Sequence, residues 1–239
     1  MGEGIYRTLS SEEFQNISSR ILYEDNHLLI VNKLVGEIVQ GDKTGDEPLS
    51  DTLKAFIAQR DGKPGRVFMG VPHRLDRPVS GIAVFAKTSK ALERLNAMFR
   101  EGEGKHLQKT YWALVEKCPT PAEGELKHYL LRNEKQNKSY VRDASVSGAK
   151  EARLRYRLLG ATERYFLVEV ILLTGRHHQI RCQLSSIGCP IKGDLKYGAR
   201  RSNRDGGISL HARSIRFEHP VRHEEVNVTA PSIMESYLK

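Results

Sequence analysis

Apolar and polar residues follow two different periods along this chain. Apolar runs and period-two alternation predict strands at residues 21–33 (a strand pair), 81–86, 110–115, 154–158, 166–172, 208–211 and 215–217. Helical spacing predicts helices at 50–59, with Ser50 as N-cap, at 89–100 with Leu92, Leu95, Met98 and Phe99 buried, and at 177–187. Adjacent alternating strands favour an α+β fold with a mixed, mainly antiparallel central sheet and flanking helices and loops.

The 239 residues contain no linker rich in Pro, Gly or Ser, so we expect a single domain over residues 21–239, preceded by an unstructured N-terminal extension, residues 1–20. The chain has no apolar run of transmembrane length and no signal core, which predicts a cytoplasmic protein with no membrane partner. Three cysteines, none in a Cys-x-x-Cys pair, predict neither a disulfide framework nor a metal site.

Charge is distributed unevenly along the chain. The net charge is +9, yet residues 1–60 carry 6 basic and 10 acidic residues, whereas residues 132–157 and 192–222 each carry 8 basic and 3 acidic residues. Two basic blocks favour a polyanionic partner such as nucleic acid. A solvated basic face explains the charge equally well.

Three polar clusters offer chemistry. In the first, Asp76 lies between Arg74 and Arg77 in a turn before an apolar strand. Nearby cations lower a carboxylate pKa by about 1–3 units, and an ionised carboxylate suits work on a sugar carbon. The alternative is a surface ion pair on a turn.

The second cluster, residues 174–181, directly follows an apolar strand and opens the last predicted helix. On that helix His177, Arg181 and Leu184 share a face, so Arg181 is expected to project toward the end of the strand. The alternative is a capped helix with solvated Arg and His. The third cluster, residues 190–198, is a glycine-punctuated basic loop whose Tyr197 is suited to stacking a base.

Common cofactor motifs are absent. The chain has no phosphate-cradling loop, no Gly-x-Ser-x-Gly turn and no Gly-x-Gly-x-x-Gly after a strand. A nucleotide-driven reaction or a dehydrogenase reaction is therefore disfavoured.

In order, these segments resemble the RluA-type pseudouridine synthases, which act on rRNA and tRNA. The resemblance spans residues 21–220 and rests on the segments 23–25 with 31–33, 73–76 with 80–81, 109–115, 174–181, 190–198, and 210–212 with 217–220. Two positions depart from the family pattern, Val79 in place of Thr and Leu34 in place of Pro. Neither departure changes the carboxylate.

The resemblance implies a role for each matching residue. Asp76 is the expected catalytic carboxylate, Tyr111 stacks on the target base, and Arg181 pairs with Asp76. RNA contacts are expected from His73, Arg74, Arg176, His177, Gln179, Lys192, Lys196 and Tyr197. Isomerising uridine to pseudouridine gains and loses no atom, so the expected enzyme needs no cofactor.

Two other functions remain open at this point. One is a non-enzymatic RNA-binding module that kept the fold, which predicts loss of Asp76 or its arginine partner. The other is a retaining glycosidase or nucleosidase, which needs two carboxyl groups about 5–5.5 Å apart. Both Asp76 and Arg181 are present, and no second carboxylate lies in a motif. We therefore expect a pseudouridine synthase that acts as a monomer on RNA.

Overall fold

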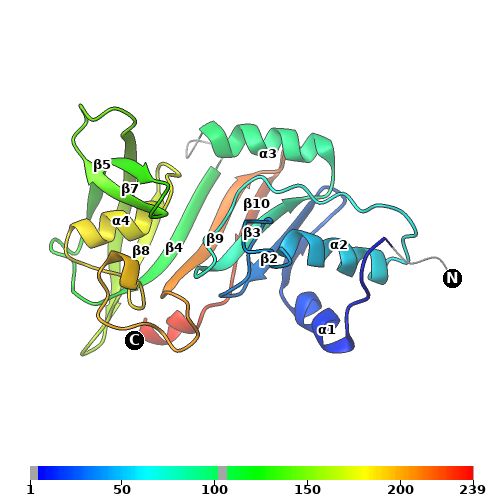
Figure 1. Cartoon of the computed structure of the whole chain (residues 1–239), viewed down its shortest axis with the longest axis horizontal. Helices are drawn as coiled ribbons and strands as arrows, with labels where there is room; N and C mark the ends of the chain where they lie inside the picture. The colour runs from blue at the N-terminus through cyan, green and yellow to red at the C-terminus, as the bar shows by residue number, and fades with distance from the viewer. Residues whose placement is uncertain (1–4, 102–106, 239) are drawn as a thin grey trace.

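A large sheet dominates the computed structural model, which describes residues 5–101 and 107–238 (Figure 1). Its strands are β1 (Ile21–Glu24), β2 (Leu28–Lys33), β3 (Ser80–Ala86), β4 (Leu107–Val115), β5 (Glu123–Asn133), β6 (Lys138–Arg142), β7 (Lys150–Ala161), β8 (Phe166–Leu172), β9 (Leu210–Glu218) and β10 (Glu225–Thr229). The helices are α1 (Ser11–Ser19), α2 (Leu49–Arg60), α3 (Ser89–Glu101) and α4 (Gln179–Ser186), with short 3-10 turns η1 (Leu195–Tyr197) and η2 (Ile233–Tyr237). Among the described residues, no helix is long and apolar enough to cross a membrane.

The sheet confirms the predicted fold class. Its strand order is β1-β2-β3-β9-β4-β8-β7-β5-β6, and β10 pairs with the outer part of β9. Every pairing is antiparallel except that of β3 with β9. The two late strands predicted from the sequence are parts of one strand, β9, because residues 210–212 and 214–217 pair with β4 on either side of a register shift.

The parallel contact between β3 and β9 requires a glycine. Gly81 has φ +108°, and a Cβ placed there would lie 2.4 Å from the backbone oxygen of Ala212. A residue with a side chain is therefore excluded both by the left-handed backbone and by the neighbouring strand. This close approach fixes the start of β3, which directly follows the Asp76 turn.

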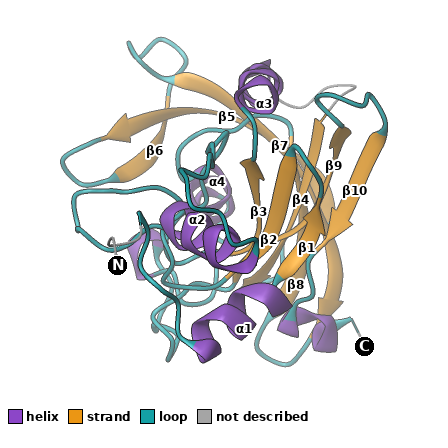
Figure 2. Ribbon diagram, turned by 90° about the vertical axis from the view of Figure 1, so that its right-hand side faces the viewer, coloured by secondary structure: helices purple, strands orange, loops and turns teal. Residues whose placement is uncertain are grey.

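The two faces of the sheet have different covers. Tyr111 and Ala113 of β4 belong to the main core, together with buried residues of α2, α3 and α4. Trp112 and Leu114 face the other way and pack with Met234 of η2. Figure 2 shows α2, α3 and α4 on one side of the strands. The face that carries Tyr111 is therefore the helix-covered face.

Several local predictions need correction. The N-terminal segment includes α1, which has a capping box between Ser10 and Glu13 and buries Ile17 in the core, so this part of residues 1–20 is not unstructured. The domain boundary itself stays a prediction. Helix α2 begins at Leu49 after Pro48, and Ser50 is buried within the helix rather than capping it.

The last two predicted helices also differ from the structure. In α3, of the four residues predicted to be buried, Leu95 is fully buried, whereas Leu92, Met98 and Phe99 are half-buried. The last helix begins at Gln179 rather than at residue 177, because His178 adopts a left-handed backbone with φ 52°. Strands β5 and β6 were not predicted, since their polar residues mask the alternation.

Candidate active site

The Asp76 carboxylate lies in the turn that precedes β3 and is about one-third exposed, with a side-chain accessibility of 33%. Its Oδ2 accepts a hydrogen bond of 3.0 Å from Nη1 of Arg181 in α4. The structure thus joins two residues that are 105 positions apart in the chain. This is the pairing that the family resemblance implied.

Arg181 is held in place by a second carboxylate. Its Nε and Nη2 donate to the two oxygens of Asp194 at 2.7 and 2.9 Å, and both side chains are almost fully buried. Burial alone would lower the pKa of Arg181, but the hydrogen bonds and charge of Asp194 and Asp76 raise it above the usual value. A fork of this kind fixes the guanidinium plane, so the free edge points at Asp76 in one orientation.

The arginines that flank Asp76 in the sequence do not supply its countercharge. Arg77 turns away and binds Asp46, with Nη1 2.6 Å from Oδ2, and it also lies near Asp42. Arg74 is exposed. The expected electrostatic partners were therefore wrong, because adjacent residues in a tight turn point in different directions. Arg181 carries that role instead.

Lys33 supports the Asp76 turn from beneath. Its side chain is completely buried, and its Nζ donates to the backbone oxygens of Leu34, Arg77 and Val79 at 2.9, 3.2 and 2.6 Å. Burial lowers the pKa of Lys33 to about 8. Sequence analysis assigned no role to this residue, since nothing local shows that a lysine at a strand end will be buried.

His178 approaches the same carboxylate, with Nε2 3.4 Å from Oδ2 of Asp76. Its Nδ1 lies 3.0 Å from the hydroxyl of Tyr197, which also accepts the backbone N–H of Ser139 at 2.8 Å. Burial lowers the pKa of His178 to about 2, so the ring is neutral. When the Tyr197 hydroxyl donates to Nδ1, the ring proton sits on Nε2 and faces Asp76.

Tyr197 does not have the place that the sequence suggested. It was predicted to stack on an RNA base, but it is 5% exposed and its ring lies 5.1 Å from the Arg181 guanidinium. Burial raises the pKa of its phenol. Its ring packs beside Arg181 and its hydroxyl binds Ser139, so Tyr197 supports the site in this structure, and its stacking on a base stays a prediction.

Tyr111 lies on β4 and is 8% exposed. It is paired with Val170 of β8 and with Ala212 of β9. Ala212 is the residue that packs against Gly81 just after the Asp76 turn, so one strand separates Tyr111 from that turn. Its stacking role stays a prediction.

Two further predicted RNA contacts are tied into the fold. Gln179 is 3% exposed; its Oε1 accepts from Thr174 and from the Arg176 backbone, and its Nε2 donates to the Arg153 backbone. The amide of Gln179 is thus buried and bonded within the chain, and RNA contact by this residue stays a prediction. His73 is neutral, since burial lowers its pKa to about 3 and its Nε2 accepts the Val84 N–H. Its RNA contact stays a prediction.

The other predicted RNA contacts are divided between two places. His177 is half-buried and stacks on His178 at 3.8 Å, while the exposed Arg176 donates from Nε to a backbone oxygen of β7. Lys196 is exposed, and its Nζ donates to the Asn137 oxygen at 3.1 Å. Lys192 lies elsewhere, in a cavity on the other side of the sheet.

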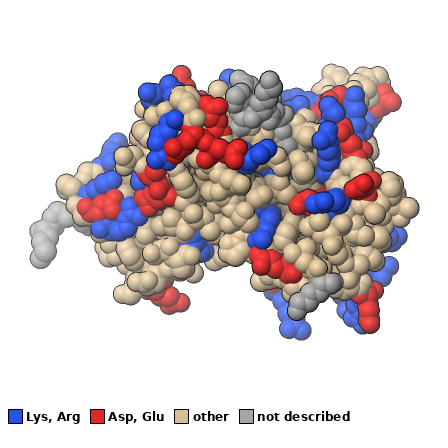
Figure 3. Space-filling model, turned by 180° about the vertical axis from the view of Figure 1, so that it is seen from behind, with Lys and Arg blue, Asp and Glu red and all other residues tan. Residues whose placement is uncertain are grey.

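The two basic blocks are only partly available to a polyanion. In residues 132–157, Arg153, Arg155 and Arg157 pair with Glu125 or Glu169. In residues 192–222, the carboxylate-paired arginines are Arg213, Arg216 and Arg222. Figure 3 accordingly shows basic and acidic side chains interleaved on one face rather than a single-sign surface. Sequence counts overestimate the usable positive charge, since they ignore cross-strand pairing.

The comparisons with known proteins agree with this geometry. A family model described as RNA pseudouridylate synthase matches residues 27–186. The chain belongs to this family. A ribosomal large subunit pseudouridine synthase C of Vibrio parahaemolyticus is 36% identical over 225 residues, which cover 92% of this chain and 67% of that protein. A pseudouridine synthase of the same name from Haemophilus ducreyi is 34% identical over 93% of this chain and 68% of its own length.

A solved structure shares the fold. The human RNA pseudouridylate synthase domain containing 4 superposes with a TM-score of 0.76 at 25% identity, covering 94% of each chain. Family membership and fold together make this protein an isomerase that acts on RNA, as the sequence predicted. Within the described part of the chain, no group of His, Cys, Asp and Glu side chains is placed to hold a metal ion.

Proposed function

We propose that this protein isomerises specific uridines of ribosomal or transfer RNA to pseudouridine, with Asp76 as the catalytic carboxylate. The observation that carries the proposal is the contact between Asp76 and Arg181. Asp76 reaches solvent at the mouth of the site, while its partner is buried and locked to Asp194. A carboxylate held in this way acts without rearranging during the reaction.

The chemistry follows from breaking and remaking one bond. The C1′–N1 bond of uridine breaks, the uracil turns, and C5 bonds to C1′, with the C5 proton lost and N1 protonated. Positive charge develops at C1′ during the cleavage, and a nearby carboxylate stabilises or captures it. Attack of Asp76 on C1′, its addition to the base, and removal of a sugar proton all fit this balance.

The target base must leave its stack to reach Asp76. Flipping a base costs a few kcal/mol and favours uridines in loops. Stacking of the base on an aromatic ring stabilises the flipped state by about 1–3 kcal/mol. We assign this stacking to Tyr111. Arg74, Arg176 and Lys196 are exposed around the site and are assigned to the phosphate backbone.

Large-subunit ribosomal RNA is the first substrate to test, because several relatives carry the name of a ribosomal large subunit pseudouridine synthase. The matched region covers only about two thirds of those proteins. The proposal also includes action as a monomer in the cytoplasm. Light scattering of the purified protein tests the first, and cell fractionation tests the second.

The test measures tritium released from RNA that is labelled at uracil C5. Wild type is expected to release tritium from unmodified large-subunit ribosomal RNA or from bulk transfer RNA. Asp76→Asn is expected to release none while keeping its RNA affinity, because the substitution removes the charge but keeps the shape.

The matched control is Asp51→Asn. Asp51 is half-exposed on α2 and pairs with Lys54, so this variant loses the same charge away from the site and should keep full turnover. Turnover by Asp76→Asn would remove Asp76 from the mechanism. RNA binding by wild type without any turnover would favour the RNA-binding module instead.

A further inference from the structure

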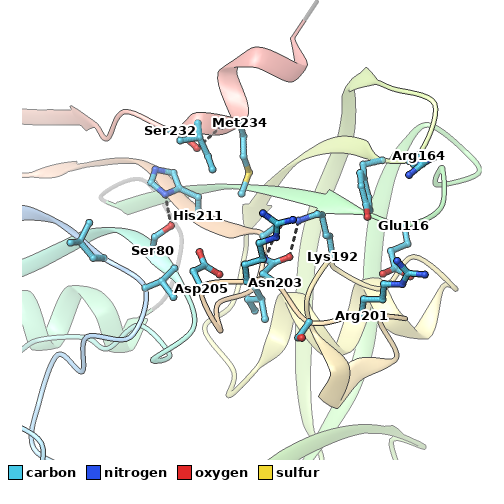
Figure 4. A pocket seen from close by; sticks show the side chains of 18 of the residues that line it. Ser80, Glu116, Arg164, Lys192, Arg201, Asn203, Asp205, His211, Ser232 and Met234 are labelled. Atoms are coloured by element: carbon cyan, nitrogen blue, oxygen red, sulfur yellow. Dashed lines mark hydrogen bonds between the residues drawn. The ribbon is translucent and has the colours of Figure 1, made fainter.

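A large cavity opens on the face of the sheet that is opposite to Tyr111. Ser80 and His211 lie in its wall (Figure 4), and register places them on the same face as Trp112. Its volume is about 1220 Å³, and Met234 of η2 also lines it. Small-molecule sites span roughly 300–1,000 Å³, so this cavity suits a segment of a chain better than one small ligand.

The cavity is lined by cations that have no carboxylate partner. Arg164, Arg200, Arg201 and Arg204 form no ion pair with any described residue, and Lys192 donates to the Asn203 amide oxygen at 2.7 Å. Two carboxylates in the lining accept hydrogen bonds from backbone N–H groups: Glu116 from Arg200 and Asp205 from Gly207. The remaining positive charge is therefore open to an anion.

The lining also offers features that suit nucleotide bases. Tyr165 is half-buried in the lining, and Lys192 Nζ lies 5.5 Å from the centre of its ring. Asn32 lines the cavity, and its buried Oδ1 has no hydrogen-bond partner among the described residues. An aromatic ring among arginines that have no carboxylate partner matches the stacking and backbone contacts that bind single-stranded RNA.

The cavity lies directly behind the catalytic turn. Lys33 lines it and also binds the backbone oxygens of Arg77 and Val79 beside Asp76. Lys192 lines it two residues before Asp194, which holds Arg181. The front site and the rear cavity therefore share supporting residues at this end of the sheet.

We propose that this rear cavity binds a single-stranded segment that flanks the target uridine of the substrate RNA. The inference rests on the proposed function for the identity of the ligand. Three arginines of the 200–204 loop bind phosphates, and Tyr165 stacks on a base. The cavity therefore contributes affinity and not chemistry.

The test compares two triple variants that lose equal charge. The first is Arg200→Gln, Arg201→Gln and Arg204→Gln. The control is Arg155→Gln, Arg157→Gln and Arg216→Gln, three exposed arginines that pair with glutamates outside the cavity. Affinity for a large-subunit ribosomal RNA transcript is measured by filter binding over a range of salt concentrations, alongside tritium release.

The cavity variant is expected to bind about tenfold more weakly, and its slope of log affinity against log salt should be smaller by about 2, since each single-strand phosphate contact contributes about 0.7. Its kcat should equal that of wild type, with the loss confined to KM. The control should keep the wild-type slope. Equal slopes for the two triple variants would overturn the proposal.

A second measurement uses unmodified protein. Ultraviolet cross-linking of wild type to oligouridine should label peptides that contain Tyr165 or the 200–204 loop, and absence of label from both would also overturn the proposal. Wild-type turnover reports separately on the proposed function. If wild type is active and the two triple variants have equal salt slopes, only the proposal about the rear cavity is rejected. If wild type is inactive and the slopes differ, only the proposed reaction is rejected.

Discussion

Arginines on the two faces of the sheet differ in burial and in their contacts with carboxylates. Arg181 is buried and contacts two carboxylates, Asp76 and Asp194. Arg201 and its neighbours in the rear cavity are exposed, and their guanidinium groups form no ion pair with a carboxylate among the described residues. A buried charge needs partners to be tolerated at all, whereas an exposed charge is stabilised by water and remains free to exchange that water for an anion.

The difference separates two tasks. At the front, Lys33, Arg181 and Asp194 hold Asp76 in one geometry, which suits a reaction centre. At the rear, exposed side chains with unpaired charge suit contact with a flexible polyanion. The same amino acid therefore positions a reactive group in one place and is available to bind substrate in the other.

The largest expected effect comes from breaking the front arrangement with Arg181→Met. This change leaves Asp194 buried without a countercharge, which should lower the free energy of unfolding by about 3–5 kcal/mol and abolish turnover. Urea denaturation and tritium release measure the two effects. Arg181→Lys should recover only part of the stability, since an ammonium lacks the fork that binds both carboxylates. A loss below about 1 kcal/mol for Arg181→Met would contradict a buried, coupled pair.

An intermediate effect is expected from acid, because each face contains a neutral buried histidine. Burial lowers the pKa of His178 to about 2 and that of His211 to about 4. Below the ordinary histidine pKa of 6.5, these histidines bind protons in the unfolded chain but stay neutral in the folded protein. The free energy of unfolding therefore falls as the pH decreases toward the pKa values of the folded protein. These two residues should each account for roughly 1–1.5 kcal/mol of this loss by about pH 5.5, and His73, whose pKa burial lowers to about 3, should add a similar amount.

Urea unfolding at neutral and mildly acidic pH checks this slope. His211→Gln should reduce the slope by roughly a third over the same range, since His73 and His178 still titrate. An unchanged slope in that variant would show that His211 does not cause the acid sensitivity.

The smallest effect is expected at Arg77, which adjoins Asp76 in the sequence but is exposed and pairs with Asp46. Arg77→Gln should leave the unfolding midpoint unchanged and turnover within about twofold, because exposed ion pairs contribute little. A turnover loss comparable to that of Arg181→Met would mean that sequence adjacency, and not the contact from α4, sets the charge of the site.

Local patterns predicted the elements whose residues alternate cleanly. Strands β2, β3, β4 and β8 appear where apolar residues alternate or run together, since one or both faces of each strand are buried. Strands β5 and β6 were missed because most of their side chains are only partly buried or exposed. Helix α1 was missed because only Ile17 of its nine residues is buried.

The candidate site divides in the same way. The sequence by itself determined which residue types are present and, through a family resemblance, predicted that Asp76, Tyr111 and Arg181 act together; the contact between Asp76 and Arg181 is the part that the structure shows. Only the tertiary structure decided that Arg181 rather than Arg77 faces Asp76, that Lys33 and Asp194 support the pair, and that Gln179 and Tyr197 are buried. The physical reason is that burial and charge pairing depend on contacts between distant segments, which no local pattern records.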